Sequence, residues 1–149
     1  MIRFADASDV PALTSLIERY WEFELIKGFD AARINTLLNE LFRSPDRGQI
    51  WVAHLGGPSV GYLLAVYLFS LEHGGLMAEI DELFVVPEKR SLKIGSALPE
   101  AATAAMVQRG IRHVQLQLAR NNSHGQRFYE QHGFEGISEY GLLHKSLQP

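Results

Sequence analysis

The residues best suited to chemistry gather where a strand passes into a helix. An apolar stretch ends at Pro87 and is followed by Arg90, Lys93, Gly95 and Ser96. A helix that starts here presents unpaired backbone N–H groups and the positive end of its dipole, an arrangement that binds phosphate. Gly95 permits close approach of the backbone, and Ser96 adds a hydroxyl donor. A helix start with merely solvated basic residues fits the spacing equally well, because one glycine and scattered cations are a weak signal.

The strand before this junction carries an acidic cluster, Glu79, Asp81 and Glu82. Side chains alternate along a strand, so we expect Glu82 to share a face with Ile80 and Phe84, and Asp81 to lie on the opposite face. A carboxylate within such an apolar strand is costly if it is buried and unpaired. We therefore expect these carboxylates to face a cleft or a partner, although an ion pair or a solvated edge explains the cluster as well.

The elements that must position these residues begin with a short strand, Ile2–Phe4, and two helices. Apolar residues recur at helical spacing over Val10–Tyr20 and again from Asp30 to just before Pro45. Three strands are predicted next, separated by glycine-containing turns and forming an antiparallel meander: Gln49–Leu55, Val60–Ser70 and Leu76–Val86. The last of these ends apolar on both faces, which is typical of a strand at the centre of a sheet.

The second half of the chain alternates helix and strand. We predict a helix from Ile94 to about Arg109, a strand over Val114–Leu118 and a short helix over Ser123–Gln131. Phe134 onward is predicted to form two closing strands. This order indicates an α/β (α+β) fold with a mixed, mainly antiparallel sheet. The length of 149 residues fits a single domain over residues 1–149.

The composition excludes several classes of protein. The chain has no cysteine, so disulfides, thiolate metal sites and a cysteine nucleophile are ruled out, and its six histidines show no metal-ligand spacing. The net charge of −3 argues against a general nucleic-acid binder. The N-terminus lacks a signal-peptide pattern, and the longest apolar run, Tyr62–Phe69, is too short to span a bilayer. We expect a cytoplasmic protein with no metal, no nucleic-acid partner and no membrane partner.

A second segment, Asn122–Phe134, carries a further pattern. It reads NSHGQRFYEQHGF and resembles the Asn-x-x-Ala-x-x-Phe-Tyr-x-x-x-Gly-Phe motif of the GNAT superfamily of acetyl-CoA-dependent N-acetyltransferases, with Gly125 replacing the usual Ala. The junction VVPEKRSLKIGSALPEAA is similar to the family's V-x-P strand end followed by Arg/Gln-x-x-Gly-x-Gly/Ala. Arg90 matches the first position and Gly95 the last, whereas Lys93 stands where the family usually has Gly. The resemblance implies a GNAT-like sheet of six to seven strands flanked by about four helices.

The resemblance also implies that acetyl-CoA binds along the junction as co-substrate. Loop N–H groups would hold its pyrophosphate, and the strand end would pair with its pantetheine arm, which requires a strand edge left unpaired where two central strands splay apart. The residues implied are Phe84, Val85, Val86, Arg90, Ser91, Lys93, Ile94, Gly95, Ser96, Asn122 and Tyr129. Asn122 and Ser123 also compete as N-cap of the second helix. The Lys93 side chain either restricts the backbone conformations open to glycine or adds charge.

Acetylation of an amine needs both a base and an acid. A primary amine with a pKa of about 10.4 must lose a proton before it attacks, and the departing thiolate, comparable to a thiol of pKa about 8.5, benefits from a proton donor. The resemblance implies Tyr129 as the general acid, since tyrosine keeps its proton at neutral pH; a packed helix-face aromatic is the alternative. It implies Glu82, with Asp81 second, as a base acting through water.

The acceptor side is the least determined part of the pattern. By family analogy, Trp21, Glu22, Glu24 and Glu72 border a pocket in which aromatic and acidic side chains suit an amine; a plain amphipathic helix end is the alternative. The acceptor can be a polyamine-like or aminoglycoside-like small molecule, an amino acid, or a protein N-terminus or lysine, and a homodimer is common in the family. A non-catalytic acyl-CoA-binding or sensor domain is the competing function, favoured by Lys93. A Rossmann-type site is disfavoured because no G-x-G-x-x-G run is present.

Overall fold

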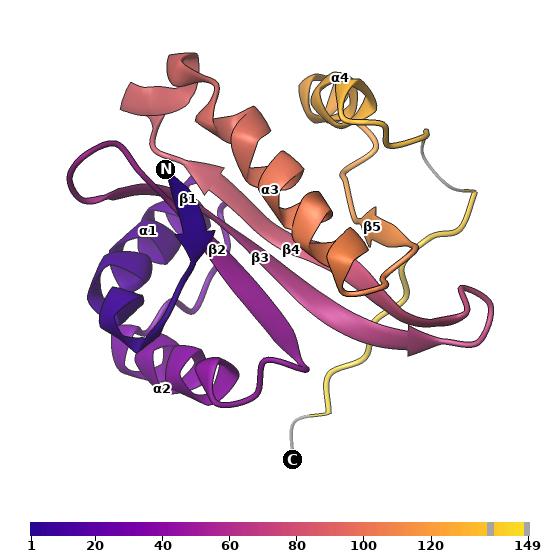
Figure 1. Cartoon of the computed structure of the whole chain (residues 1–149), viewed down its shortest axis with the longest axis horizontal. Helices are drawn as coiled ribbons and strands as arrows, with labels where there is room; N and C mark the ends of the chain where they lie inside the picture. Colours follow the sequence, from indigo (N-terminus) through magenta and orange to yellow (C-terminus); the bar gives the residue numbers. More distant parts are fainter. Residues whose placement is uncertain (137–138, 148–149) are drawn as a thin grey trace. The chain divides into compact units, whose positions relative to one another are not determined.

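The computed structural model describes residues 1–136 and 139–147, with the backbone alone for Ser91 (Figure 1). The chain forms two compact units, Met1–Gln117 and Leu118–Pro149, which are described here one at a time. The first unit contains the sheet and three of the α-helices, and the second contains the remaining helix, α4 (Ser123–Gln131). Among the described residues, no helix is both long enough and apolar enough to cross a membrane.

One five-stranded sheet is formed by the described residues, in the order β1-β2-β3-β4-β5. Its strands are β1 (Ile2–Phe4), β2 (Gly48–His54), β3 (Ser59–Ser70), β4 (Gly75–Val85) and β5 (Val114–Leu116). The first four pair antiparallel, and β5 runs parallel to β4. The predicted meander is confirmed with bounds shifted by about one residue. The predicted six to seven strands are wrong for the part of the chain that the structure describes.

The two closing strands expected after Phe134 account for this difference. The residues described between 134 and 147 form no ladder pair, although Ile137 and Ser138 lie outside the described part. A strand exists only when a neighbour supplies its hydrogen bonds, and an isolated hairpin is marginal in water. This stretch is also interrupted by Gly136 and Gly141, which raise the entropy lost on becoming extended.

Helices α1 (Val10–Phe23) and α2 (Ala31–Phe42) cover one face of the sheet, as Figure 1 shows. A short 3-10 turn, η1 (Ala7–Asp9), precedes α1 and is capped by Asp6, while Asp30 caps α2 by accepting from the Arg33 N–H at 3.0 Å. The buried core on this face joins the apolar stripes of both helices to alternate residues of β2, β3 and β4: Leu13, Leu16, Ile17, Ile34, Leu38, Ile50, Val52, Tyr62 and Phe84.

Helix α3 (Ile94–Gln108) packs on the opposite face of the sheet, after a 3-10 segment η2 (Pro87–Leu92) that the sequence did not predict. Pro99 lies inside α3 and is buried, and the helix continues through it. The helix ends as predicted at Gly110, which has φ +88°, and the Ile111 N–H reaches back to the Met106 carbonyl at 3.0 Å. A left-handed glycine and this six-residue hydrogen bond define a Schellman ending.

A β-bulge at Asp81 interrupts β4. Leu64 pairs with Glu82, but its neighbour Ala65 pairs with Ile80, so Asp81 is an extra residue without a partner on β3. An extra residue exchanges the two faces of a strand beyond the bulge. Glu82 therefore shares the α1/α2 face with Phe84, and Ile80 lies on the other face. The expectation that Glu82 and Ile80 share a face is wrong, because uninterrupted alternation was assumed.

Candidate active site

The C-terminal part of β4 has one edge that no described strand covers. β4 pairs with β3 as far as Val85, whereas its pairing with β5 stops at Ile80. The Val86 N–H donates to the Val60 carbonyl on the β3 side at 2.9 Å, so the backbone groups of Val85 point toward the uncovered edge. The first unit therefore has a strand edge, at the C-terminal part of β4, that no described strand of the unit pairs with.

A sharp turn at Lys93 joins η2, which follows this strand end, to α3. Lys93 adopts φ +61° and ψ +15°, the left-handed conformation that glycine adopts most readily, and its own side chain makes no capping hydrogen bond to the helix. The first turn of α3, which follows this residue, carries the positive end of the helix dipole. A Cβ added at Gly95 would meet no atom within 4 Å, so the space above this glycine is open. The open space at the start of this helix suits a phosphate.

The Arg90 side chain connects the strand end to the end of α1. Its Nε donates to the Val85 carbonyl at 3.0 Å, and its guanidinium carbon lies 4.9 Å from the ring centre of Phe23 and 5.7 Å from that of Phe84. Arg90 therefore occupies a backbone acceptor of the uncovered edge. The predicted ligand-binding residues Phe84, Val85, Val86 and Ile94 are buried, and the side chain of Ser91 lies outside the described residues.

Glu82 is held by two hydrogen bonds from different elements. The Tyr62 hydroxyl on β3 donates to its Oε1 at 2.8 Å, and the Trp21 indole N–H on α1 donates to its Oε2 at 3.0 Å. Burial raises the pKa of Glu82, and both hydrogen bonds act in the opposite direction. Sequence reasoning missed Tyr62; its signal was a tyrosine in the middle of an apolar strand, where a buried hydroxyl needs a partner.

The other predicted acidic residues are placed differently. Asp81, at the bulge, is exposed, as are Glu22 and Glu24 at the end of α1. Glu72 lies in the turn before β4, separated from Glu82 by most of that strand, roughly 20 Å of extended chain. The structure thus brings Trp21 to Glu82 but does not bring Glu72 to them.

In the second unit, α4 is built as a locally capped helix. The Asn122 side chain accepts from the Gly125 N–H at 2.8 Å, so Asn122, and not Ser123, is the N-cap. Gly133 has φ +86°, and the Phe134 N–H donates to the Tyr129 carbonyl at 3.0 Å, a second Schellman ending. The rings of Tyr129 and Phe134 lie 5.5 Å apart, edge to face. The motif's Asn, Gly and last Phe therefore have a structural role that fixes the half-buried Tyr129 on its helix.

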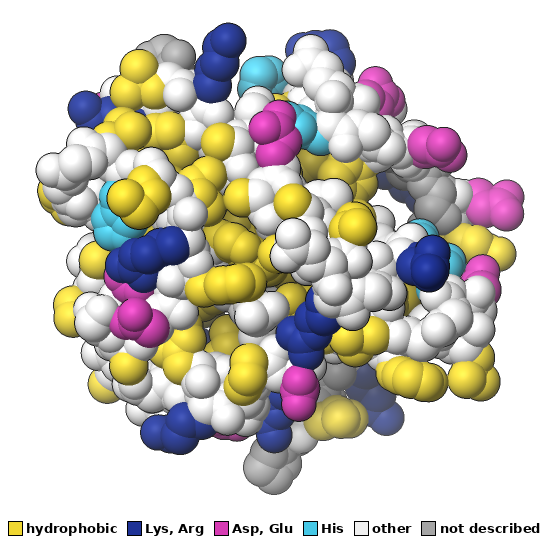
Figure 2. Space-filling model, in the orientation of Figure 1, with side chains coloured by type: hydrophobic (Ala, Val, Ile, Leu, Met, Phe, Trp, Pro, Cys, Tyr) yellow, Lys and Arg dark blue, Asp and Glu magenta, His cyan; other side chains and the backbone are white. Residues whose placement is uncertain are grey.

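The charged side chains are dispersed. Figure 2 shows Lys and Arg scattered among Asp and Glu over the face that it draws. The described residues hold no group of three or more His, Asp or Glu side chains placed to bind a metal ion.

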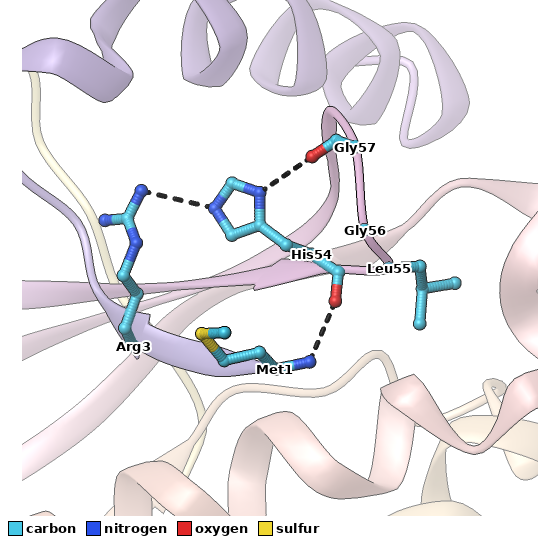
Figure 3. Close-up of a pocket in the computed structure, with 6 residues that line it drawn as sticks. All are labelled: Met1, Arg3, His54, Leu55, Gly56 and Gly57. Atoms are coloured by element: carbon cyan, nitrogen blue, oxygen red, sulfur yellow. Dashed lines mark hydrogen bonds between the residues drawn. The ribbon is translucent and has the colours of Figure 1, made fainter.

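A shallow hollow near the N-terminus serves a different purpose (Figure 3). Arg3 binds both oxygens of Asp9 at 2.8 Å, and its Nη2 lies 3.3 Å from His54 Nε2. His54 Nδ1 lies 3.2 Å from the Gly57 carbonyl, and the Met1 amine donates to the His54 carbonyl at 2.8 Å. These contacts fasten β1 to β2 and η1. None of the predicted site residues lines this hollow.

Comparison with known proteins agrees with this geometry. The Acetyltransferase (GNAT) domain family matches residues 46–136. Over 146 residues the chain is 28% identical to an uncharacterized N-acetyltransferase of Bacillus subtilis, YhfO, covering 98% of this chain and 95% of that protein. Over 87 residues it is 34% identical to an uncharacterized N-acetyltransferase of Archaeoglobus fulgidus, a match that spans 58% of this chain and only 59% of the archaeal protein.

A solved structure extends the likeness to the whole chain. The integron cassette protein HFX_CASS3, from the mobile metagenome of Cole Harbour Salt Marsh, is 30% identical, with a TM-score of 0.85 over 99% of this chain and 91% of its own. The GNAT domain family matches more than half of the chain, which is enough to assign the protein to a family. The chain belongs to the GNAT acetyltransferase family.

Proposed function

We propose that this protein transfers an acetyl group from acetyl-CoA to a primary amine by direct attack in a ternary complex. The observation that carries the proposal is the uncovered edge of β4, which is followed by η2, the Lys93 turn and the start of α3. Such an edge can pair with an amide-containing arm, and such a helix start can bind a phosphate.

The proposed acetyl-CoA site divides between these two features. The backbone of Phe84, Val85 and Val86 would pair with the pantetheine amides, and the N–H groups from Ile94 to Ser96 would hold the pyrophosphate, with Arg90 and Lys93 adding charge. Because Arg90 donates to the Val85 carbonyl, this side chain would have to leave that acceptor when a pantetheine amide takes its place. We assign Ser91 and Asn122 to the same site by family analogy.

In the proposed reaction the amine nitrogen attacks the thioester carbonyl carbon. A C–N bond forms, the C–S bond breaks, and the products are the N-acetyl amine and CoA. The ammonium proton leaves through water to Glu82, with Asp81 as the second candidate base. The departing thiolate takes the hydroxyl proton of Tyr129 as general acid, and the second proton that the nitrogen loses after the C–N bond forms restores this hydroxyl. A backbone N–H of the β4 edge would stabilise the oxyanion of the tetrahedral intermediate.

The proposed acceptor side lies at the end of α1. Trp21, Glu22 and Glu24 come from this helix end, and Phe23 packs under Arg90 near the end of β4. Exposed carboxylates beside aromatic rings attract a cationic amine. Glu72 lies at the far end of β4, so we include it only for a long or polymeric acceptor.

Thiol release from acetyl-CoA across a panel of amines tests the proposal. The panel contains a polyamine, an aminoglycoside, free amino acids and peptides with a free N-terminus or lysine. We expect release above hydrolysis with at least one amine, lowered about 100-fold or more in Tyr129→Phe because general acid catalysis contributes roughly this much. The exposed Tyr140→Phe variant is the matched control and should retain activity.

Binding of acetyl-CoA without release for any amine would contradict the enzymatic proposal. That result would favour the non-catalytic acyl-CoA sensor, for which the departure from glycine at Lys93 is the supporting observation. Absence of both binding and release would contradict both functions.

A further inference from the structure

Glu82 is the one carboxylate of the β4 cluster whose two oxygens are each tied to a different part of the core. Tyr62 donates to Oε1 at 2.8 Å from β3, and Trp21 donates to Oε2 at 3.0 Å from α1. The donors are 20 and 61 residues away in sequence. A carboxylate with one donor on each oxygen has its plane and its side-chain torsions fixed.

Packing holds both donors in place. Tyr62 is completely buried, and its ring meets the edge of Tyr20 at 6.3 Å with an interplanar angle of 83°. The Trp21 ring packs edge to face on Phe29 at 5.9 Å. Tyr62 cannot turn away from Glu82 without disturbing the core between the sheet and α1, because a close-packed ring has few alternative rotamers. The half-buried Trp21 ring is held by its contact with Phe29.

Stability alone is a poor reason for this arrangement. Removing a carboxylate from water costs free energy that hydrogen bonds to neutral donors offset only in part. Burial raises the pKa of Glu82, and its neighbour Asp81 adds to this effect, whereas the donors from Tyr62 and Trp21 oppose it. Burial and the charge of Glu82 also raise the pKa of Tyr62 far above its usual value, so this hydroxyl remains a donor at every working pH. Tyr62 can orient Glu82 but cannot serve as a base.

We propose that Tyr62 and Trp21 are positioning residues, which fix the orientation of the Glu82 carboxylate for proton transfer from the amine. This inference rests on the proposed acetyltransferase function. It gives Trp21 a role through Glu82, in addition to any contact with the acceptor. The bulge at Asp81 completes the arrangement, because it turns Glu82 onto the face where both donors lie.

Tyr62→Phe and Trp21→Phe test the proposal, since each removes one donor and keeps the ring. We expect the acid limb of the kcat/KM profile against pH to move up by about one unit and kcat at neutral pH to fall about tenfold, the size of one lost hydrogen bond to a charged group. KM for acetyl-CoA should stay the same. Tyr67→Phe is the matched control on the same strand, because its hydroxyl donates to the neutral Gln49 side chain and not to Glu82.

A direct titration separates this inference from the proposed function. The Glu82 carboxyl signal can be followed by NMR in protein labelled with ¹³C-glutamate and assigned with Glu82→Gln. An upward shift in Tyr62→Phe and Trp21→Phe, absent in Tyr67→Phe, supports the positioning role even if no amine is acetylated. If the Glu82 titration and the pH profile are the same in all three folded variants, the proposal is overturned. Should Tyr62→Phe unfold, Trp21→Phe, whose side chain is only half buried, decides the question.

Discussion

Lys93 holds the left-handed conformation at the start of α3, where the GNAT motif usually has glycine. Its φ of +61° and ψ of +15° lie in the region that places Cβ against the following carbonyl. This conformation costs an L-residue roughly 1–2 kcal/mol, and replacement by glycine removes that cost. Glycine also makes the unfolded chain more flexible, which lowers the free energy of unfolding by about 0.5–1 kcal/mol. Lys93→Gly should therefore raise the free energy of unfolding by about 0.5–1 kcal/mol.

Chemical and thermal unfolding measure this gain. For a chain of this size the expected rise in Tm is about 2–3 °C. Leu25→Gly is the matched positive control, since Leu25 has φ +58° at the end of α1 and its side chain is 85% exposed. The Ile26 N–H bonds the Trp21 carbonyl at 2.8 Å, so Leu25 stands where α3 and α4 have Gly110 and Gly133. Lys93→Ala keeps the Cβ and should show no gain.

Binding of acetyl-CoA separates the backbone of Lys93 from its charge. If the Lys93 ammonium contacts the phosphates, Lys93→Gly and Lys93→Ala should both raise the Kd for acetyl-CoA by roughly threefold, the scale of an exposed ion pair. This increase in Kd should become smaller at high salt. Leu25→Gly should leave Kd unchanged. A lower Tm in Lys93→Gly than in Lys93→Ala would refute the strain argument. Equal Kd values in all variants would refute the charge argument.

Two further predictions follow from local contacts. Hydrogen bonds from Arg3 lower the pKa of the buried Asp9, so this pair stabilises the fold above the ordinary Asp pKa of about 3.9 and less as the pH falls through the lower folded value. The stability difference between wild type and Asp9→Asn, from urea unfolding, should therefore be larger at pH 6 than at pH 3, and a constant difference would contradict the role of the ion pair. At Gly125, an added Cβ would lie 2.7 Å from Asn122 Nδ2. The Asn122 side chain, which caps the helix by accepting from the Gly125 N–H, must therefore move in Gly125→Ala. The gain of about 1 kcal/mol in helix propensity and the loss of about 1 kcal/mol from the cap should nearly cancel, and a Tm raised by several degrees would show that the cap survives.

The order of helices and strands could be predicted from the sequence over most of the chain. The meander, the first two helices and the ending of α3 at Gly110 follow from periodicity and from a glycine just past the helix end. The two strands expected after Phe134 illustrate the limit of this reasoning, since a strand needs partners that its own sequence does not contain.

The sequence by itself determined the family and the internal construction of α4. Asn122, Gly133 and Phe134 act through hydrogen bonds that span at most five residues, so their spacing is sufficient to specify them. Only the tertiary structure decided the environment of Glu82. The bulge at Asp81 exists only in the pairing of β4 with β3, and it reverses the face that simple alternation predicts. Tyr62 and Trp21 reach Glu82 from distant segments because the sheet and α1 pack together, an arrangement that no local spacing encodes.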